Sequence, residues 1–148
     1  MALEVRINDM LPGSYGYTSA GHWPNWQNVN TNLTEYEELT LDWQLDRNSM
    51  TGRCTVNGRT FSVQLKPFMG VMGMPPEEGG FHSTFPPRNC GGNIDCKDLT
   101  KGSVLYLPIS VDGDFFAVGD GHAAQGDGEV DGLHLDFMKI SMKQRFWR

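Results

Sequence analysis

An eleven-residue stretch, Gly119–Glu129, constrains this chain more than any other part of the sequence. It reads Gly-Asp-Gly-His-Ala-Ala-Gln-Gly-Asp-Gly-Glu and holds four glycines, three acids, one histidine and one glutamine. An interior glycine costs a helix about 1 kcal/mol relative to alanine, so this glycine density excludes a helix. A connecting loop without a function rarely gathers so many ligating side chains. We therefore predict a glycine-bent active-site loop between two strands, with His122, Asp127 and Glu129 turned towards one point.

Alternating apolar and polar residues predict strands in several parts of the chain. The stretches read as strands are residues 3–7, 38–46, 53–56, 60–65, 104–111 and 133–145. Within this series, Asn57-Gly58 predicts a two-residue hairpin turn, and Pro108 predicts an edge or bulged position for its strand. No segment has the periodicity of a convincing amphipathic helix. The chain is therefore predicted to be all-β, either a sandwich or a barrel.

Two long segments lack this alternation. The first is predicted to be a long loop or a segment ordered by the packing of its aromatic residues, and the second to be a loop without regular structure. Residues 13–32 are rich in glycine, asparagine and aromatic residues, and residues 67–93 are crowded with glycines and prolines. Loops longer than about 12–15 residues within a domain are usually functional or disordered. The second segment is too apolar for a disordered linker, so we expect it to be functional.

Composition limits the partners of the chain. A formal net charge of -6 makes nucleic acids and anionic membrane surfaces poor partners, and no apolar run approaches the roughly 20 residues of a membrane span. The three cysteines match no zinc or redox motif, which favours a reduced, cytoplasmic location. Both ends of the chain stop within a strand-like pattern. We therefore expect a piece of something longer, or a homo-oligomer that buries these ends.

Two groups of residues are candidates for chemistry. His122 has carboxylates five and seven residues further on, at Asp127 and Glu129, and this set can bind a divalent metal. It can equally form a general acid–base cluster, or a structural turn in which the acids cap backbone amides. The second group ends at Asp95, where the preceding diglycine at 91–92 leaves backbone N–H groups free to face an oxyanion.

Four blocks of sequence resemble the acetamidase/formamidase family in order and spacing. They are residues 67–75, 83–95, 102–108 and 119–130, within a family-like core of about 58–140 in a single domain of residues 1–148. The resemblance implies a jelly-roll-like β-sandwich with long glycine- and proline-rich loops. It also implies a bound divalent metal and hydrolysis of short-chain linear amides, such as formamide or acetamide, to the carboxylic acid and ammonia.

The resemblance also implies roles for individual residues. Asp95, His122 and Glu129 are the expected metal ligands, and zinc suits this set best, although calcium and manganese stay open. His122 and Glu129 are thereby also catalytic residues of a metal-assisted hydrolysis. Asp127, or whichever acid the metal leaves free, is expected to accept the proton of the attacking water and to pass it to the leaving ammonia.

Three further residues are expected to hold the small amide substrate. They are Ser83, Asn93 and Gln125. Gln125 is expected to line the same site as the metal ligands, and Ser83 and Asn93 to orient the amide.

Two non-catalytic alternatives stay open. Family members are typically about twice as long, so this chain is expected to be a short, truncated member that could bind metal or a partner without turnover. Alternatively, Tyr17, Trp23 and Trp26 could form a stacking platform for a carbohydrate on a β-sandwich.

Overall fold

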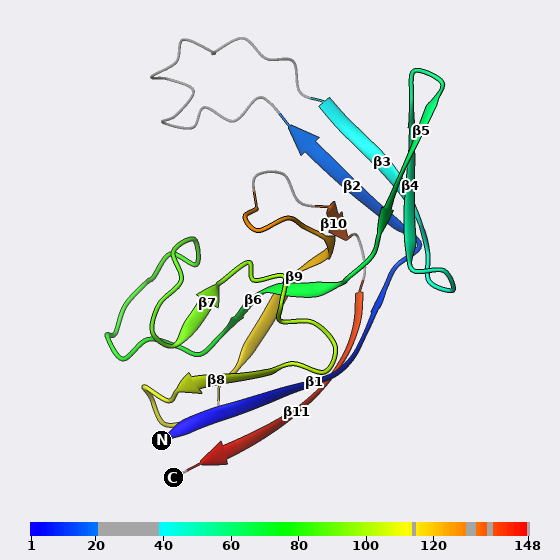
Figure 1. Ribbon diagram of the computed structural model, residues 1–148. Helices are drawn as coiled ribbons and strands as arrows, with labels where there is room; N and C mark the ends of the chain where they lie inside the picture. The colour runs from blue at the N-terminus through cyan, green and yellow to red at the C-terminus, as the bar shows by residue number, and fades with distance from the viewer. Residues whose placement is uncertain (21–38, 114, 130–132, 136–137, 148) are drawn as a thin grey trace, which may run out of the picture.

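The computed structural model describes residues 1–20, 39–113, 115–129, 133–135 and 138–147 (Figure 1). These residues form eleven strands and no helix, so the all-β prediction is confirmed. The strands are β1 (Ala2–Pro12), β2 (Tyr15–Ala20), β3 (Leu39–Asp46), β4 (Thr51–Val56), β5 (Arg59–Gln64), β6 (Phe68–Gly73), β7 (Gly91–Asn93), β8 (Val104–Pro108), β9 (Ala117–Ala124), β10 (Leu133–Leu135) and β11 (Met138–Trp147). No helix able to cross a membrane occurs in this part of the chain.

The strands form two antiparallel sheets. The smaller sheet has the order β11-β1-β8, and the larger has the order β5-β4-β3-β2-β10-β9-β6-β7. In the smaller sheet, Leu3 of β1 pairs with Phe146 on one side and with Leu107 on the other. The first and last strands therefore run side by side, as Figure 1 shows. β8, which ends at Pro108, lies at the edge of its sheet as predicted.

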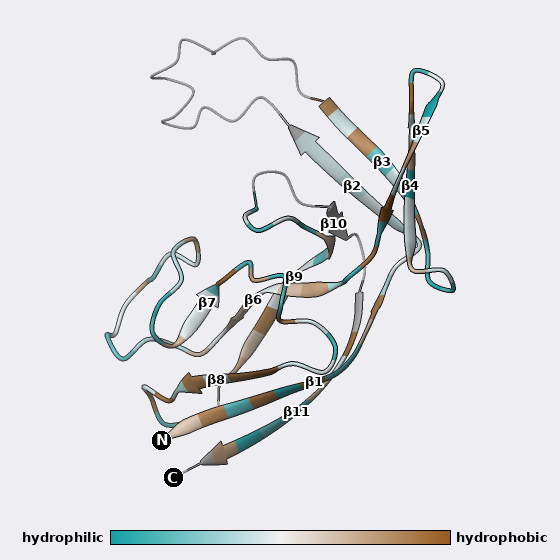
Figure 2. Cartoon of the chain, in the orientation of Figure 1, coloured by the Kyte–Doolittle hydropathy of each residue, from teal (hydrophilic) through white to brown (hydrophobic). Residues whose placement is uncertain are grey.

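The core joins the smaller sheet to the β6 end of the larger one. Alternation along β1, visible in Figure 2, buries Leu3, Val5 and Ile7. Leu3 and Val5 belong to a buried cluster with Met74 and Leu107, and Ile7 belongs to a second cluster that includes Met69 and Met72. Each such side chain contributes about 1.5–3 kcal/mol when fully buried. These contacts make the fold a β-sandwich.

The hairpin between β4 and β5 forms as predicted. Asn57 and Gly58 are its two central residues, with φ of 49° and 75°. Positive φ at both positions is the requirement of a type I′ turn, which asparagine followed by glycine meets at low cost. The flanking residues Val56 and Arg59 pair directly across the turn.

Several predicted loops are strands instead. β2 lies within residues 13–32, and β6 and β7 lie within residues 67–93. The prediction treated glycine as a strand breaker, whereas in β6 glycine permits a close approach between strands. A Cβ on Gly73 would lie 2.6 Å from the backbone nitrogen of Gly92 in β7.

One further prediction differs from the structure, and another lies partly outside the described residues. The last strand, predicted over residues 133–145, is two strands in different sheets, β10 and β11. Trp23 and Trp26 of the carbohydrate-platform hypothesis lie outside the described residues, whereas Tyr17 lies in β2.

The close approach at Gly73 gives a test of the fold. Gly73→Ala is expected to lower the free energy of unfolding by about 2–3 kcal/mol, because its Cβ would meet backbone that cannot move alone. Gly119→Ala is the matched control on the neighbouring strand, since a Cβ there meets nothing within 4 Å. Its effect is expected to stay within about 0.5 kcal/mol. Equal urea midpoints for the two variants would contradict the close packing of β6 on β7.

Candidate metal centre

The candidate centre is built on the ladder between β6 and β9. Phe68 pairs with His122, and Met69 with Gly121. The ring of Phe68 stacks on the imidazole of His122, with centroids 5.0 Å apart and planes 15° from parallel. Both side chains are fully buried. This stacking fixes the plane of the imidazole before any ligand arrives.

Four side chains converge beside this stack. Asp95, Asp120, His122 and Glu129 each offer one ligand atom, and these atoms all lie within 4.8 Å of one another. His122 Nε2 lies 3.3 Å from Asp120 Oδ2 and 3.6 Å from Glu129 Oε1. Its distance to Asp95 Oδ1 is 3.7 Å. Asp120 and His122 share a face of β9 because they are two residues apart in a strand.

Gly70 of β6 forms the floor of this cluster. A Cβ at this position would lie 2.5 Å from Asp120 Oδ2 and 3.0 Å from His122 Nε2, and closer still to Asp95 Oδ1. No side chain larger than a hydrogen atom therefore fits under the ligand atoms. The missing Cβ is what allows the acids to meet there.

Backbone contacts hold Asp95 in place. Its N–H donates to the carbonyl of Gly70 at 3.1 Å, and its own carbonyl accepts a hydrogen bond of 2.8 Å from Gln125 Nε2. Asp95 and Asp120 have φ of 46° and 57°, in the left-handed region that costs a non-glycine residue free energy. Such strain is typical of functional sites whose surroundings hold them in place.

The electrostatics of the cluster favour a cation. Burial, and then the neighbouring charges of Glu129 and Asp120, raise the pKa of Asp95 from its ordinary value of 3.8 to about 6. Asp95 Oδ1 is buried and has no hydrogen-bond partner among the described residues. Three carboxylates and one imidazole that face a common point are a donor set for a divalent ion. The residues therefore fit the metal that the family resemblance implies.

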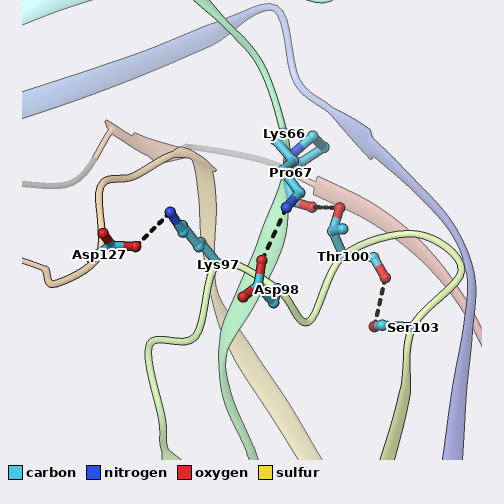
Figure 3. A network of polar contacts seen from close by, with 7 residues as sticks. All are labelled: Lys66, Pro67, Lys97, Asp98, Thr100, Ser103 and Asp127. Carbon is cyan, nitrogen blue, oxygen red and sulfur yellow. Dashed lines mark hydrogen bonds and ion pairs between the residues drawn. The ribbon is translucent and has the colours of Figure 1, made fainter.

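The structure brings together all three predicted metal ligands, Asp95, His122 and Glu129, but not Asp127. The Asp127 side chain is 95% exposed, and its Oδ1 lies 2.6 Å from Lys97 Nζ (Figure 3). This contact lowers the pKa of Asp127.

Asp120 takes a place in the cluster that the sequence analysis did not assign. Residues 119–124 were predicted to be loop and are instead part of β9. In a strand, the Asp-x-His spacing of Asp120 and His122 places both side chains on one face. This spacing was the sequence signal that could have predicted the place of Asp120 beside His122.

The predicted substrate residues lie in two places. The side-chain amide of Gln125 donates to the backbone carbonyl of Asp95, as described above. Ser83 and Asn93 instead both contact Phe85: Ser83 Oγ accepts a hydrogen bond from the Phe85 N–H, and Asn93 Nδ2 donates to the Phe85 carbonyl, each at 3.2 Å. Neither of these two belongs to the four-residue cluster.

Comparison with known proteins agrees with the motifs. Residues 78–137 match the model of the acetamidase/formamidase family. A formamidase from Methylophilus methylotrophus is 53% identical over 47 residues, which are 32% of this chain and 12% of that protein. An acetamidase from Mycolicibacterium smegmatis is 38% identical over 71 residues, which are 40% of this chain and 18% of that protein.

The solved structure of an acetamidase from Bacillus halodurans shares the fold. It superposes with a TM-score of 0.69 at 29% identity, over 96% of this chain and 46% of that chain. This chain is therefore similar in sequence and in fold to members of the acetamidase/formamidase family, as its sequence predicted. It spans less than half the length of each of these three relatives.

The raised pKa of Asp95 predicts a change in stability with pH. Because its folded pKa of about 6 exceeds its ordinary value of 3.8, the folded state keeps a proton that the unfolded state has lost. The contribution of Asp95 to stability is therefore full below about pH 4 and is lost as pH rises through about 6. Metal-free Asp95→Asn is expected to melt at a higher temperature than the metal-free wild type at pH 7.5, with a smaller difference at pH 4.

The same variant separates stability from metal binding. Asp95→Asn is expected to lose stoichiometric metal while it gains stability, because asparagine keeps the shape and tolerates the left-handed backbone. Asp127→Asn, whose side chain is exposed outside the cluster, is the control and is expected to bind metal normally. If Asp95→Asn bound metal and unfolded as the wild type does, the geometry of the cluster would be contradicted.

The glycine floor gives a second test. Gly70→Ala is expected to weaken metal binding by about 10–100-fold, in the range of other changes that displace ligands without removing them. The fold is expected to survive, because the three atoms nearest to a Cβ at Gly70 belong to side chains and not to backbone. Calorimetric titration with zinc measures the loss, and Gly119→Ala controls for the effect of alanine in this ladder. Equal zinc affinity in both variants would exclude Gly70 as the floor.

Proposed function

We propose that this chain carries the active site of a metal-dependent amidase that hydrolyses short linear amides, such as formamide and acetamide, to the carboxylic acid and ammonia. The observation that carries the proposal is the convergence of Asp95, Asp120, His122 and Glu129 over Gly70. The printed names of the relatives, formamidase and acetamidase, support the choice of substrate class.

In this proposal Asp95, His122 and Glu129 hold the metal, and zinc is the expected ion. When bound, a divalent ion polarises a carbonyl oxygen and lowers the pKa of water. The ring of Phe68 keeps His122 in one orientation. Gln125 donates a hydrogen bond to the backbone carbonyl of Asp95 and so keeps Asp95 in place. We therefore assign Gln125 a positioning role alongside any contact with substrate.

Proton transfer in this proposal falls to Asp120. A general base must lie within hydrogen-bond reach of the proton that it accepts. Asp120 lies inside the cluster, whereas Asp127 is bound to Lys97 at the surface. Asp120 accepts a proton from the attacking water and delivers it to the nitrogen of the amide as the C–N bond breaks, so that ammonia leaves.

Release of ammonia tests the proposal. The purified chain, loaded with zinc, is expected to release ammonia from formamide or acetamide, and a chelator is expected to stop it. Asp120→Asn is expected to lower kcat by roughly 10²–10⁴-fold, the usual contribution of a general acid–base group. Glu129→Gln is expected to lose metal and activity together. Asp127→Asn is the matched control and is expected to keep a rate close to that of the wild type.

The non-catalytic alternative makes the opposite prediction. Stoichiometric zinc without turnover of either amide would identify this chain as a metal-binding module of the family. If Asp120→Asn released ammonia at the wild-type rate and Asp127→Asn released it slowly, the proton-transfer role would belong to Asp127.

Self-association and a cytoplasmic location complete the proposal. The edge strands β5, β7, β8 and β11 of the two sheets leave backbone groups for pairing with another chain. A homo-oligomer is therefore expected in light scattering.

A further inference from the structure

A second cavity lies on the opposite face of the β6–β9 ladder from the metal centre. Val71 and Gly73 of β6 and Ala117 of β9 line it. In the register of this ladder, Val71 pairs with Gly119 and Gly73 with Ala117. These positions alternate with Gly70 and Asp120, so they face the other side of the sheet. The cavity shares no lining residue with the four-residue cluster.

The cavity has the size and walls of a site for an apolar ligand. Its volume is about 410 Å³, within the range of about 300–1,000 Å³ usual for small-molecule sites. Its walls include Met74, three prolines, Phe115 and Phe116. Phe115 is 63% exposed, which leaves apolar surface at the site without a cover. Formamide and acetamide are too small and too polar to fill such a space.

Among the residues that the structure describes, the cavity is lined by one formally charged side chain, Arg88, and by no carboxylate. The backbone of Arg88 is fixed by two reciprocal hydrogen bonds with Gly91, each of 2.9 Å. One guanidinium nitrogen, Nη2, donates to the Ser83 carbonyl at 3.2 Å. A guanidinium carries five N–H donors, and a carboxylate is the partner that fits their planar fork.

We propose that this cavity binds an amphiphilic monocarboxylate, with the hydrocarbon chain against the proline and phenylalanine walls and the carboxylate on Arg88. The apolar lining selects the chain, and the guanidinium of Arg88 selects the anionic end. The site lies apart from the cluster that carries the proposed amidase activity. It is therefore tested independently, by binding and not by turnover.

Calorimetric titration with octanoate and with 1-octanol tests the site in the whole chain. The wild type is expected to bind both, with octanoate at least about tenfold tighter, since a charge-assisted hydrogen bond contributes about 1.5–3 kcal/mol. Arg88→Gln is expected to bind the two equally, at the affinity of the alcohol. Arg59→Gln, on the distant strand β5, is the control and is expected to keep the preference.

A variant that fills the cavity tests the walls. Ala117→Leu projects a larger side chain into the space and is expected to weaken both ligands about tenfold or more. Val118→Leu, on the opposite face of the same strand, is the matched control and is expected to bind normally. Circular dichroism of each variant checks that the fold is retained.

Four results would overturn the proposal. One is no binding of octanoate to the wild type, and another is equal binding to Ala117→Leu. The third is a dimer that Ala117→Leu alone converts to monomer, which would assign the cavity to a second copy of the chain. Loss of alcohol binding in Arg88→Gln would make Arg88 a support of the cavity wall and would remove the carboxylate from the proposal.

Discussion

The absence of a Cβ at Gly70 is the constraint on which the candidate site depends. Acids approach the centre from β9 and from the segment after β7, and their ligand atoms meet over this one residue. The carbonyl of Gly70 also accepts the N–H of Asp95. One glycine therefore provides both the space for the carboxylates and an anchor for one of them. A larger residue would remove the space, whatever the identity of the acids.

Much of the fold could be predicted from the sequence, because most of its strands follow simple rules. The alternation of apolar and polar residues predicted β1 and β3, and Asn57-Gly58 predicted the hairpin of β4 and β5. The glycine-rich strands were missed because local propensity counts glycine against a strand. Residues 68–73 form the strand β6 because they pack against a neighbouring strand, and this contact cannot be predicted from the sequence of β6 alone.

The candidate site was predicted only in part, because one of its residues lies in a glycine-rich strand that was predicted to be a loop. Asp95, His122 and Glu129 were chosen by residue type and by resemblance, and the structure brings them together. Asp127 was chosen as a carboxylate five residues after His122 and by resemblance, but spacing along the chain does not fix where a side chain points in the segment after β9. Asp120 is selected by strand alternation, which applies only once residues 117–124 are known to form β9. Identifying the site thus depended on the secondary structure of a glycine-rich segment.

Metal binding and turnover are separable questions for this chain. The four residues of the cluster and their glycine floor all lie between residues 70 and 129, within a chain that shares its fold with a solved acetamidase. Three carboxylates at one point oppose folding when no cation is present, as the raised pKa of Asp95 indicates. A cation that binds only the folded state reverses this cost and stabilises the fold by mass action. In the proposed function, residues of this chain alone would hold the metal, whereas catalysis also requires that the amide and the water be held beside it.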